Sequence, residues 1–118
     1  MPLVFASLPV ENPLDGFSTG LVYSYIAFNR TREVQALDEV VFGVLEFYMG
    51  KSASHRLRDL PGSTRLTRDV GCGLQTIEDT LCMLEMLFGV EFSAAEIAQV
   101  HTLEDLRQLV AGRVATAS

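Results

Sequence analysis

The chain is poor in cysteine and histidine, and this scarcity excludes several kinds of site. Its 118 residues include two cysteines, Cys72 and Cys82, and two histidines, His55 and His101. None of them has the spacing of a metal-ligand set, so we expect no metal site and place each histidine at a surface or a helix end. We expect no disulfide between the cysteines, because we predict a reducing, cytoplasmic location.

Long apolar runs are also missing. The most apolar segments, EVVFGVLEFYMG and GLVYSYIAF, are far shorter than the roughly 20 residues that a membrane-spanning helix needs. The N-terminal MPLVFASLPVENP is apolar but lacks the positively charged flank of a signal peptide. We therefore predict a cytoplasmic chain without a membrane partner. Its 48% apolar and 20% charged residues are typical of one folded domain.

Basic residues are absent from one long segment. Residues 69–106 carry eight acidic residues and no lysine or arginine, whereas residues 51–68 carry five basic residues against one acid. The net charge of the whole chain is −6. This balance argues against nucleic acid and for protein partners with basic surfaces, although an ordinary solvated surface is the alternative. The arginines of residues 51–68 either fold back onto the acids or form a second surface: Arg56, Arg58, Arg65 and Arg68.

Residues 1–30 are predicted to form an N-terminal extension. Residues 1–20 hold three of the four prolines and read as an irregular arm. Residues 20–30 form either a short strand or an apolar helix, and periodicity cannot separate the two. This apolar segment needs cover, either from the helices that follow or from a second copy of the chain, so a homodimer through the extension is one expectation.

Residues 31–118 are predicted to form a helical domain. Its first main helix is expected to begin at Thr31, as the N-cap, and to end at Gly50. A long polar loop at residues 51–68 follows, and apolar side chains are expected to pin it to the core: Leu57, Leu60 and Leu66.

The second half of this domain is predicted to hold three more helices. One runs from about residue 74 to residue 88, with acids opposite an apolar stripe: Leu74, Ile77, Leu81, Leu84 and Phe88. A short helical turn follows Ser93, which can form a capping box with Glu96. The last helix begins at Thr102, with Asp105 at its third position.

The order of these landmarks resembles the acyl carrier protein family, including the carrier domains of polyketide and peptide synthases. The matching segments are ALDEVVFGVLEFYMG, TRLTRDVG and LEMLFGVEFSAAEIAQVHTLEDL, within roughly residues 34–114. The resemblance implies an all-α fold: a small antiparallel bundle of three main helices and a short one, with a long loop after the first.

The family attaches phosphopantetheine to a serine at the start of the second helix. In this sequence that place reads Cys72-Gly73-Leu74, and two alignments put either Leu74 or Gly73 at the serine position. Both remove the hydroxyl, so the degenerate motif predicts that phosphopantetheine is absent. The alternatives are a working carrier with a displaced attachment residue and a helical dimerisation module unrelated to acyl transfer. Cys72 is expected in a tight turn and Cys82 in the core.

The second helix of carrier proteins generally recognises partner enzymes through its carboxylates. The resemblance therefore implies that four acids bind basic surfaces of enzymes in fatty acid, polyketide or related acyl metabolism: Asp69, Glu78, Asp79 and Glu85. Met83 and Met86 add adaptable apolar surface beside them. No spacing brings a cysteine, a histidine and an acid together as a catalytic set, so we predict an interaction protein and not an enzyme.

Overall fold

A computed structural model describes residues 16–50 and 57–117, and residues 1–15, 51–56 and 118 lie outside this description. The described ranges contain no strand and only one isolated bridge, between Arg65 and Thr102. The all-α class expected from the sequence is therefore confirmed. The elements are α2 (Thr19–Thr31), α3 (Val34–Met49), the 3-10 turn η2 (Leu57–Asp59), α4 (Leu74–Phe88), α5 (Ala94–Ala98) and α6 (Leu103–Ala117).

The ambiguous segment at residues 20–30 is a helix. The side chain of Ser18 caps α2 by accepting a hydrogen bond from the N–H of Leu21 at 3.1 Å. Arg32 ends the helix in the left-handed conformation, with φ of 62°. The chain turns sharply at this elbow, and α3 begins two residues later with Glu33 as its N-cap.

Thr31 is not the N-cap of α3, contrary to the expectation from the sequence. It is the last residue of α2, where its hydroxyl donates to the carbonyl of Ala27 at 2.9 Å and accepts from the N–H of Glu33 at 3.2 Å. The Thr31 hydroxyl therefore caps backbone groups at the C-terminal end of α2. It does not begin α3, because the left-handed Arg32 separates the two helices.

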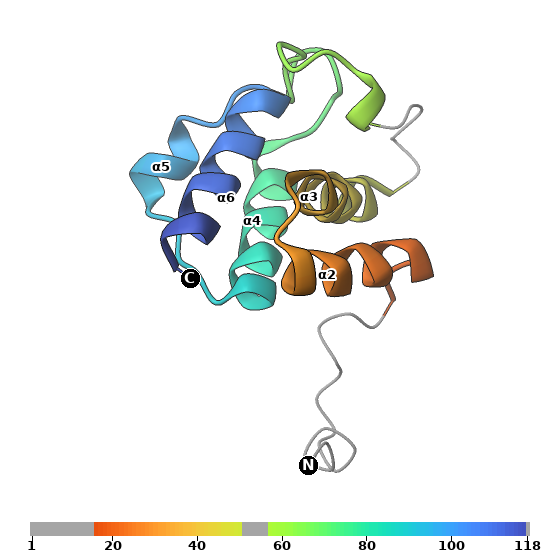
Figure 1. Ribbon diagram of the computed structural model, residues 1–118. Helices are drawn as coiled ribbons and strands as arrows, with labels where there is room; N and C mark the ends of the chain where they lie inside the picture. The colour runs from red at the N-terminus through yellow and green to blue at the C-terminus, as the bar shows by residue number, and fades with distance from the viewer. Residues whose placement is uncertain (1–15, 51–56, 118) are drawn as a thin grey trace.

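α3 is the central helix of the core. Figure 1 shows it nearly end-on, with α2 and α4 lying across it on different sides. Val34, at its first turn, is exposed, but most of its apolar residues are buried: Leu37, Val40, Val41, Phe42, Val44, Leu45 and Met49. The apolar spacing expected for this helix therefore does describe its buried side.

α2 crosses α3 closely at a glycine. A Cβ atom added to Gly43 would lie 2.7 Å from Cδ1 of Leu21, which is closer than such atoms can approach without moving. Leu21 is itself buried, so the absence of a side chain at Gly43 allows α2 to seat on α3. Glycine is tolerated here in mid-helix despite its poor helix propensity because it permits this contact.

α2 also contacts the last turn of α4. The hydroxyl of Tyr25 donates to the carbonyl of Leu87 at 2.6 Å. The rings of Tyr25 and Phe28 each meet Phe88 edge to face, with centroids 5.6 Å apart. The second half of the predicted extension thus packs into the same core as the main helices.

The connection between α3 and α4 is anchored to the core and to α6. Leu57 and Leu66 are buried and Leu60 partly buried, as expected. The backbone of the connection also pairs with the start of α6: the N–H of Leu66 donates to His101 at 2.9 Å, and that of Leu103 donates to Thr64 at 3.0 Å. This pairing joins segments far apart in the sequence, so no local pattern predicted it.

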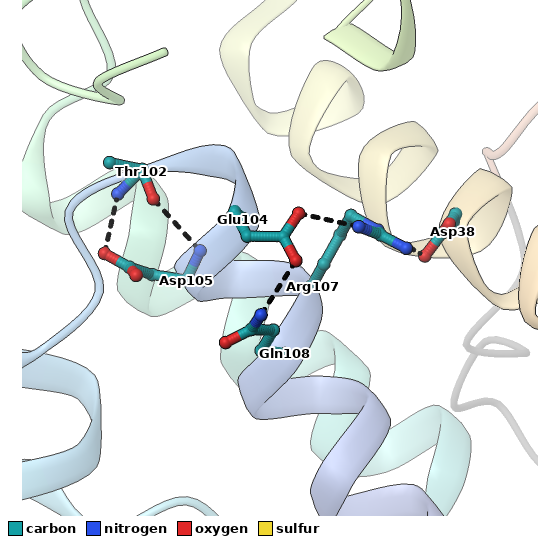
Figure 2. A network of polar contacts seen from close by, with 6 residues as sticks. All are labelled: Asp38, Thr102, Glu104, Asp105, Arg107 and Gln108. Carbon is teal, nitrogen blue, oxygen red and sulfur yellow. Dashed lines mark hydrogen bonds and ion pairs between the residues drawn. The ribbon is translucent and has the colours of Figure 1, made fainter. Parts of the chain in front are cut away.

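Both capping arrangements expected in the second half are confirmed. Ser93 and Glu96 form the capping box, in which each side chain accepts from the other's backbone N–H. At the start of α6, the Thr102 hydroxyl accepts from the N–H of Asp105. The Asp105 carboxylate in turn accepts from the N–H groups of Thr102 and His101, and Figure 2 draws the Thr102–Asp105 pair. α6 then buries Leu103, Leu106 and Val110.

A polar network ties α6 to α3 (Figure 2). Arg107 donates from Nε to Asp38 of α3 at 2.9 Å and from Nη1 to Glu104 at 2.7 Å. Gln108 donates to the second oxygen of Glu104 at 2.9 Å. The hydrogen bond to Asp38 contributes most to raising the pKa of Arg107 above its ordinary value. These carboxylates are engaged in holding the two helices together.

The crossing at Gly43 predicts opposite effects for two glycine substitutions. Gly43→Val forces Leu21 to move, and we expect the free energy of unfolding to fall by about 1–3 kcal/mol. Gly112→Ala is the matched control, because Gly112 lies in α6 with no atom near its missing Cβ. It should raise that free energy by roughly 0.5–1 kcal/mol through helix propensity. Urea denaturation measures both, and a Gly43→Val protein as stable as the wild type would contradict the close crossing.

The cap of α6 predicts a pH dependence. Partial burial acts to raise the pKa of Asp105, but the hydrogen bonds from His101 and Thr102 outweigh it and the net pKa is lowered. A lowered pKa means that Asp105 stabilises the fold above its unfolded-state pKa and loses this contribution as the pH falls through its folded-state pKa.

We therefore expect Asp105→Asn to lower the free energy of unfolding near neutral pH by roughly 0.5–1.5 kcal/mol. The difference from the wild type should shrink as the pH falls from about 5 to about 2. Urea denaturation at a series of pH values measures it. A difference that stays constant over this range would show that the Asp105 charge contributes nothing.

Candidate interaction surface on α4

The first turn of α4 carries no hydroxyl at the position where a carrier protein needs one. Gly73 is the N-cap, and it has no side chain that could accept a hydrogen bond from the first turn. Leu74 is the first helical residue. Leu74 was expected to begin the buried stripe, but its side chain is 62% exposed. The physical reason is position: residues 73–75 are all exposed, so nothing covers this end of the helix, and burial begins one turn later.

Cys72 is a buried residue in the connection just before α4. Its side chain is 1% exposed, and its N–H donates to the carbonyl of Leu66 at 2.8 Å. Burial raises the pKa of the Cys72 thiol, so the reactive thiolate is disfavoured. Cys72 lies in an irregular stretch, residues 71–73, and not in the tight turn that was expected, and its burial gives no support to a thiol that replaces the missing serine.

Cys82 was expected in the core and is exposed instead. The buried side of α4 includes Leu81 and Leu84. Each step along an α-helix rotates the side chain by about 100°, so the residue after Leu81 points away from the buried side. Apolar character alone suggested burial, but the rotational position of Cys82 places it in solvent.

The four carboxylates singled out in the sequence differ in what they contact. Asp69 accepts from the N–H of Arg65 at 2.9 Å, and Asp79 accepts from the Gln75 side chain at 2.9 Å. Glu85 accepts from a backbone N–H in the turn after α4, at 2.8 Å. Glu78 is exposed and has no hydrogen-bond or ion-pair partner among the described residues. Glu78 is therefore the carboxylate that is most available to another molecule.

Four of the five exposed residues of α4 form a stripe, which we call the α4 surface; the fifth, Gln75, is not part of it. The stripe comprises Leu74, Glu78, Cys82 and Met86, four residues apart in each case. Leu74 and Met86 are 62% and 59% exposed, and they end a stripe that is about 18 Å long at 1.5 Å per residue. The stripe therefore has a carboxylate between two apolar ends.

Tyr48 of α3 borders the α4 surface. Burial raises the pKa of its phenol, and the nearby Asp79 and Cys82 raise it further. The ring therefore stays neutral and adds no charge to this side. Met83, predicted to add apolar surface here, is partly buried, so it contributes less than Met86.

The basic loop does not neutralise α4 within the described residues. Arg65 and Arg68 are exposed and make no ion pair there, whereas Arg56 and the side chain of Arg58 lie outside the description. His101 is exposed next to α6, and His55 is also outside the description. Of the two alternatives for the basic loop, the described part gives no sign of arginines folded onto the acids.

Residues 16–50 and 57–117 hold neither a metal-binding cluster nor a membrane-spanning helix. No group of three histidine, cysteine or acidic side chains in these ranges could hold a metal ion. No helix in them has the length and apolar character needed to cross a bilayer.

Comparison with known proteins identifies no relative: no family model, no curated protein and no solved structure matches this chain.

The contacts of Glu85 and Glu78 predict different costs of truncation. Glu85→Ala leaves the partly buried N–H of Phe92 without its acceptor, so we expect the free energy of unfolding to fall by about 1–2 kcal/mol. Glu78→Ala, on the same helix, should change it by less than about 0.5 kcal/mol. Thermal and urea denaturation compare the two, and equal losses would contradict the division of the acids into structural and available groups.

Proposed function

We propose that this chain is a carrier-protein-like helical domain that bears no phosphopantetheine and works by binding other proteins. The partners in this proposal are basic-surfaced enzymes of fatty acid, polyketide or related acyl metabolism. The observation that carries it is Glu78, an exposed carboxylate without a described intramolecular partner, between the exposed Leu74 and Met86. The domain has no catalytic role in this proposal.

The order of elements supports the carrier-like part of the proposal. A main helix, α3, is followed by a long connection, a second main helix, the short α5 and the last helix, α6. This is the order that the resemblance to acyl carrier proteins led us to expect. α2 is an addition to that pattern, and it packs on α3 and α4 without reaching over the start of α4, which stays exposed.

The chemistry at the start of α4 supports the absence of a prosthetic group. Phosphopantetheine is attached through a hydroxyl, and neither Gly73 nor Leu74 has one. The nearest thiol, that of Cys72, is buried. A chain that keeps the helices of a carrier without its attachment point retains the protein-binding part of the carrier's work.

The α4 surface has the physical properties of a steering and docking site. An exposed carboxylate such as Glu78 mainly sets the rate of encounter and the choice of partner, and salt screens it. Leu74 and Met86 add apolar area, and full burial of such a side chain contributes roughly 1.5–3 kcal/mol. Binding should therefore be anchored by the apolar ends and oriented by the charge.

A charge reversal tests the proposal. The probe is a purified ketosynthase with a basic carrier-binding surface, in a titration followed by surface plasmon resonance. We expect Glu78→Lys to weaken binding roughly tenfold at low salt, about 1.4 kcal/mol, and less at high salt. Asp59→Lys is the matched control, because Asp59 is an exposed acid on η2 and its reversal changes the net charge equally.

Two results would sink the proposal. One is equal weakening of binding by Glu78→Lys and Asp59→Lys. That result would mean that binding depends on the net charge of the chain and not on the α4 surface. The other is a mass increase of one phosphopantetheine arm after incubation of the wild-type chain with coenzyme A and a broad-specificity phosphopantetheinyl transferase. That increase would identify a working carrier with a displaced attachment residue.

A further inference from the structure

A link of two residues, Arg32 and Glu33, joins α2 to α3. Arg32 has φ of 62°, and it is the one non-glycine residue with positive φ in the part of the chain that the structure describes. A residue with a side chain is strained in this left-handed conformation, because its Cβ atom crowds the following carbonyl oxygen. The sharp turn between the two helices is therefore held in a conformation that its own residue disfavours.

The turn also interrupts a run of residues that suits a continuous helix. Residues 29–36 read NRTREVQA and contain neither proline nor glycine. Arginine, glutamate, glutamine and alanine are good helix formers. The Arg32 guanidinium lies 5.1 Å from the centroid of the Phe28 ring. Residues four apart are also neighbours on a continuous helix, so this contact does not oppose straightening of the link.

The first turn of α3 has backbone N–H groups that a continuous helix would satisfy. Such a helix bonds the N–H groups of residues 33–36 to the carbonyls of residues 29–32. In the observed turn, Glu33 donates instead to the Thr31 hydroxyl at 3.2 Å, and Ala36 donates to the Glu33 carbonyl at 3.1 Å. The N–H groups of Val34 and Gln35 have no acceptor among the described residues. Straightening the link would therefore add helical hydrogen bonds and remove the left-handed residue.

The contacts that hold α2 in place do not involve the link. Leu21 is buried against Gly43 of α3. The Tyr25 hydroxyl donates to the carbonyl of Leu87 in α4 at 2.6 Å, and its ring meets that of Phe88 with centroids 5.6 Å apart. Because every copy of the chain carries the same α2, this site on α3 and α4 is complementary to the α2 of any copy.

We propose that the site on α3 and α4 also takes the α2 helix of a second copy, so that two chains form a dimer by exchanging α2. In this dimer each link is helical, and residues 19–49 form one helix about 46 Å long at 1.5 Å per residue. Each α2 makes in the other copy the contacts that it makes within one chain. This inference goes beyond the proposed function and stands on α2 and the link, so either proposal can fail alone.

The exchanged dimer should form and dissociate slowly. α2 must leave one site before it enters another, and this exposes the buried Leu21 and Phe28 to water. The dimer should therefore accumulate when the full chain is refolded at high protein concentration, and it should persist after dilution. Size-exclusion chromatography after refolding over a concentration series measures it. A chain that elutes as a monomer after refolding at every concentration would overturn the proposal.

A glycine in the link tests the source of the exchange. Glycine adopts positive φ without strain and disfavours a helix interior, so Arg32→Gly favours the closed monomer in two ways. We expect it to raise the dissociation constant of the dimer at least about tenfold. Arg30→Gly is the matched control, because it removes the same charge at a position that lies in α2. Residue 30 is helical in both forms, so the dissociation constant should stay near the wild-type value.

Circular dichroism confirms that both glycine variants are folded. Equal weakening of the dimer by the two variants would contradict a link that straightens. So would an Arg32→Gly chain that dimerises as well as the wild type.

A mixed dimer of wild-type copies shows which copy supplies α2. Isotopically labelled and unlabelled chains are refolded together, and the dimer is isolated. Isotope-filtered nuclear Overhauser spectra then report only contacts between the two copies, and we expect such contacts between the rings of Tyr25 and Phe88. A dimer in which these rings meet only within one copy would show that the chains associate through another surface and would refute the exchange.

Discussion

The close crossing of α2 and α3 at Gly43 is the constraint on which the rest of the structure depends. Because Gly43 lets Leu21 seat directly on α3, the residues one and two turns further along the same side of α2 come within reach of the last turn of α4. Tyr25 and Phe28 make that contact. α4 is then held against α2 and α3 by its apolar side, and its remaining side faces solvent. α2 is thus a structural member of the core.

Most acids in the acidic half of the chain hold the fold together. Asp105 caps α6, Glu104 helps to tie α6 to α3 through Arg107, and Glu85 fixes the turn after α4. Their charges are satisfied by backbone N–H groups or by an arginine. Because residues 69–106 contain acids but no lysine or arginine, the sequence alone suggests one uniform acidic binding face. In the structure its charge serves mainly local hydrogen bonds, and Glu78 is the exposed exception on α4.

The α4 surface carries charge of one sign between apolar ends, and this is why we propose a partner of the opposite sign. The acids of α4 were visible in the sequence, because they recur at helical spacing.

Short-range patterns were enough to predict the class of the fold, the capping box at Ser93 and the start of α6 at Thr102. Each depends on hydrogen bonds between residues three or four positions apart, which the order of amino acids specifies directly. Which of these side chains are buried depended instead on how the helices pack. Leu74 fits the apolar spacing of α4 but stays exposed because no element covers the first turn, and Cys82 points outward because of its rotation about the helix axis. Whether residues 20–30 would form a strand or a helix depended on α3 and α4, whose packed surfaces α2 completes.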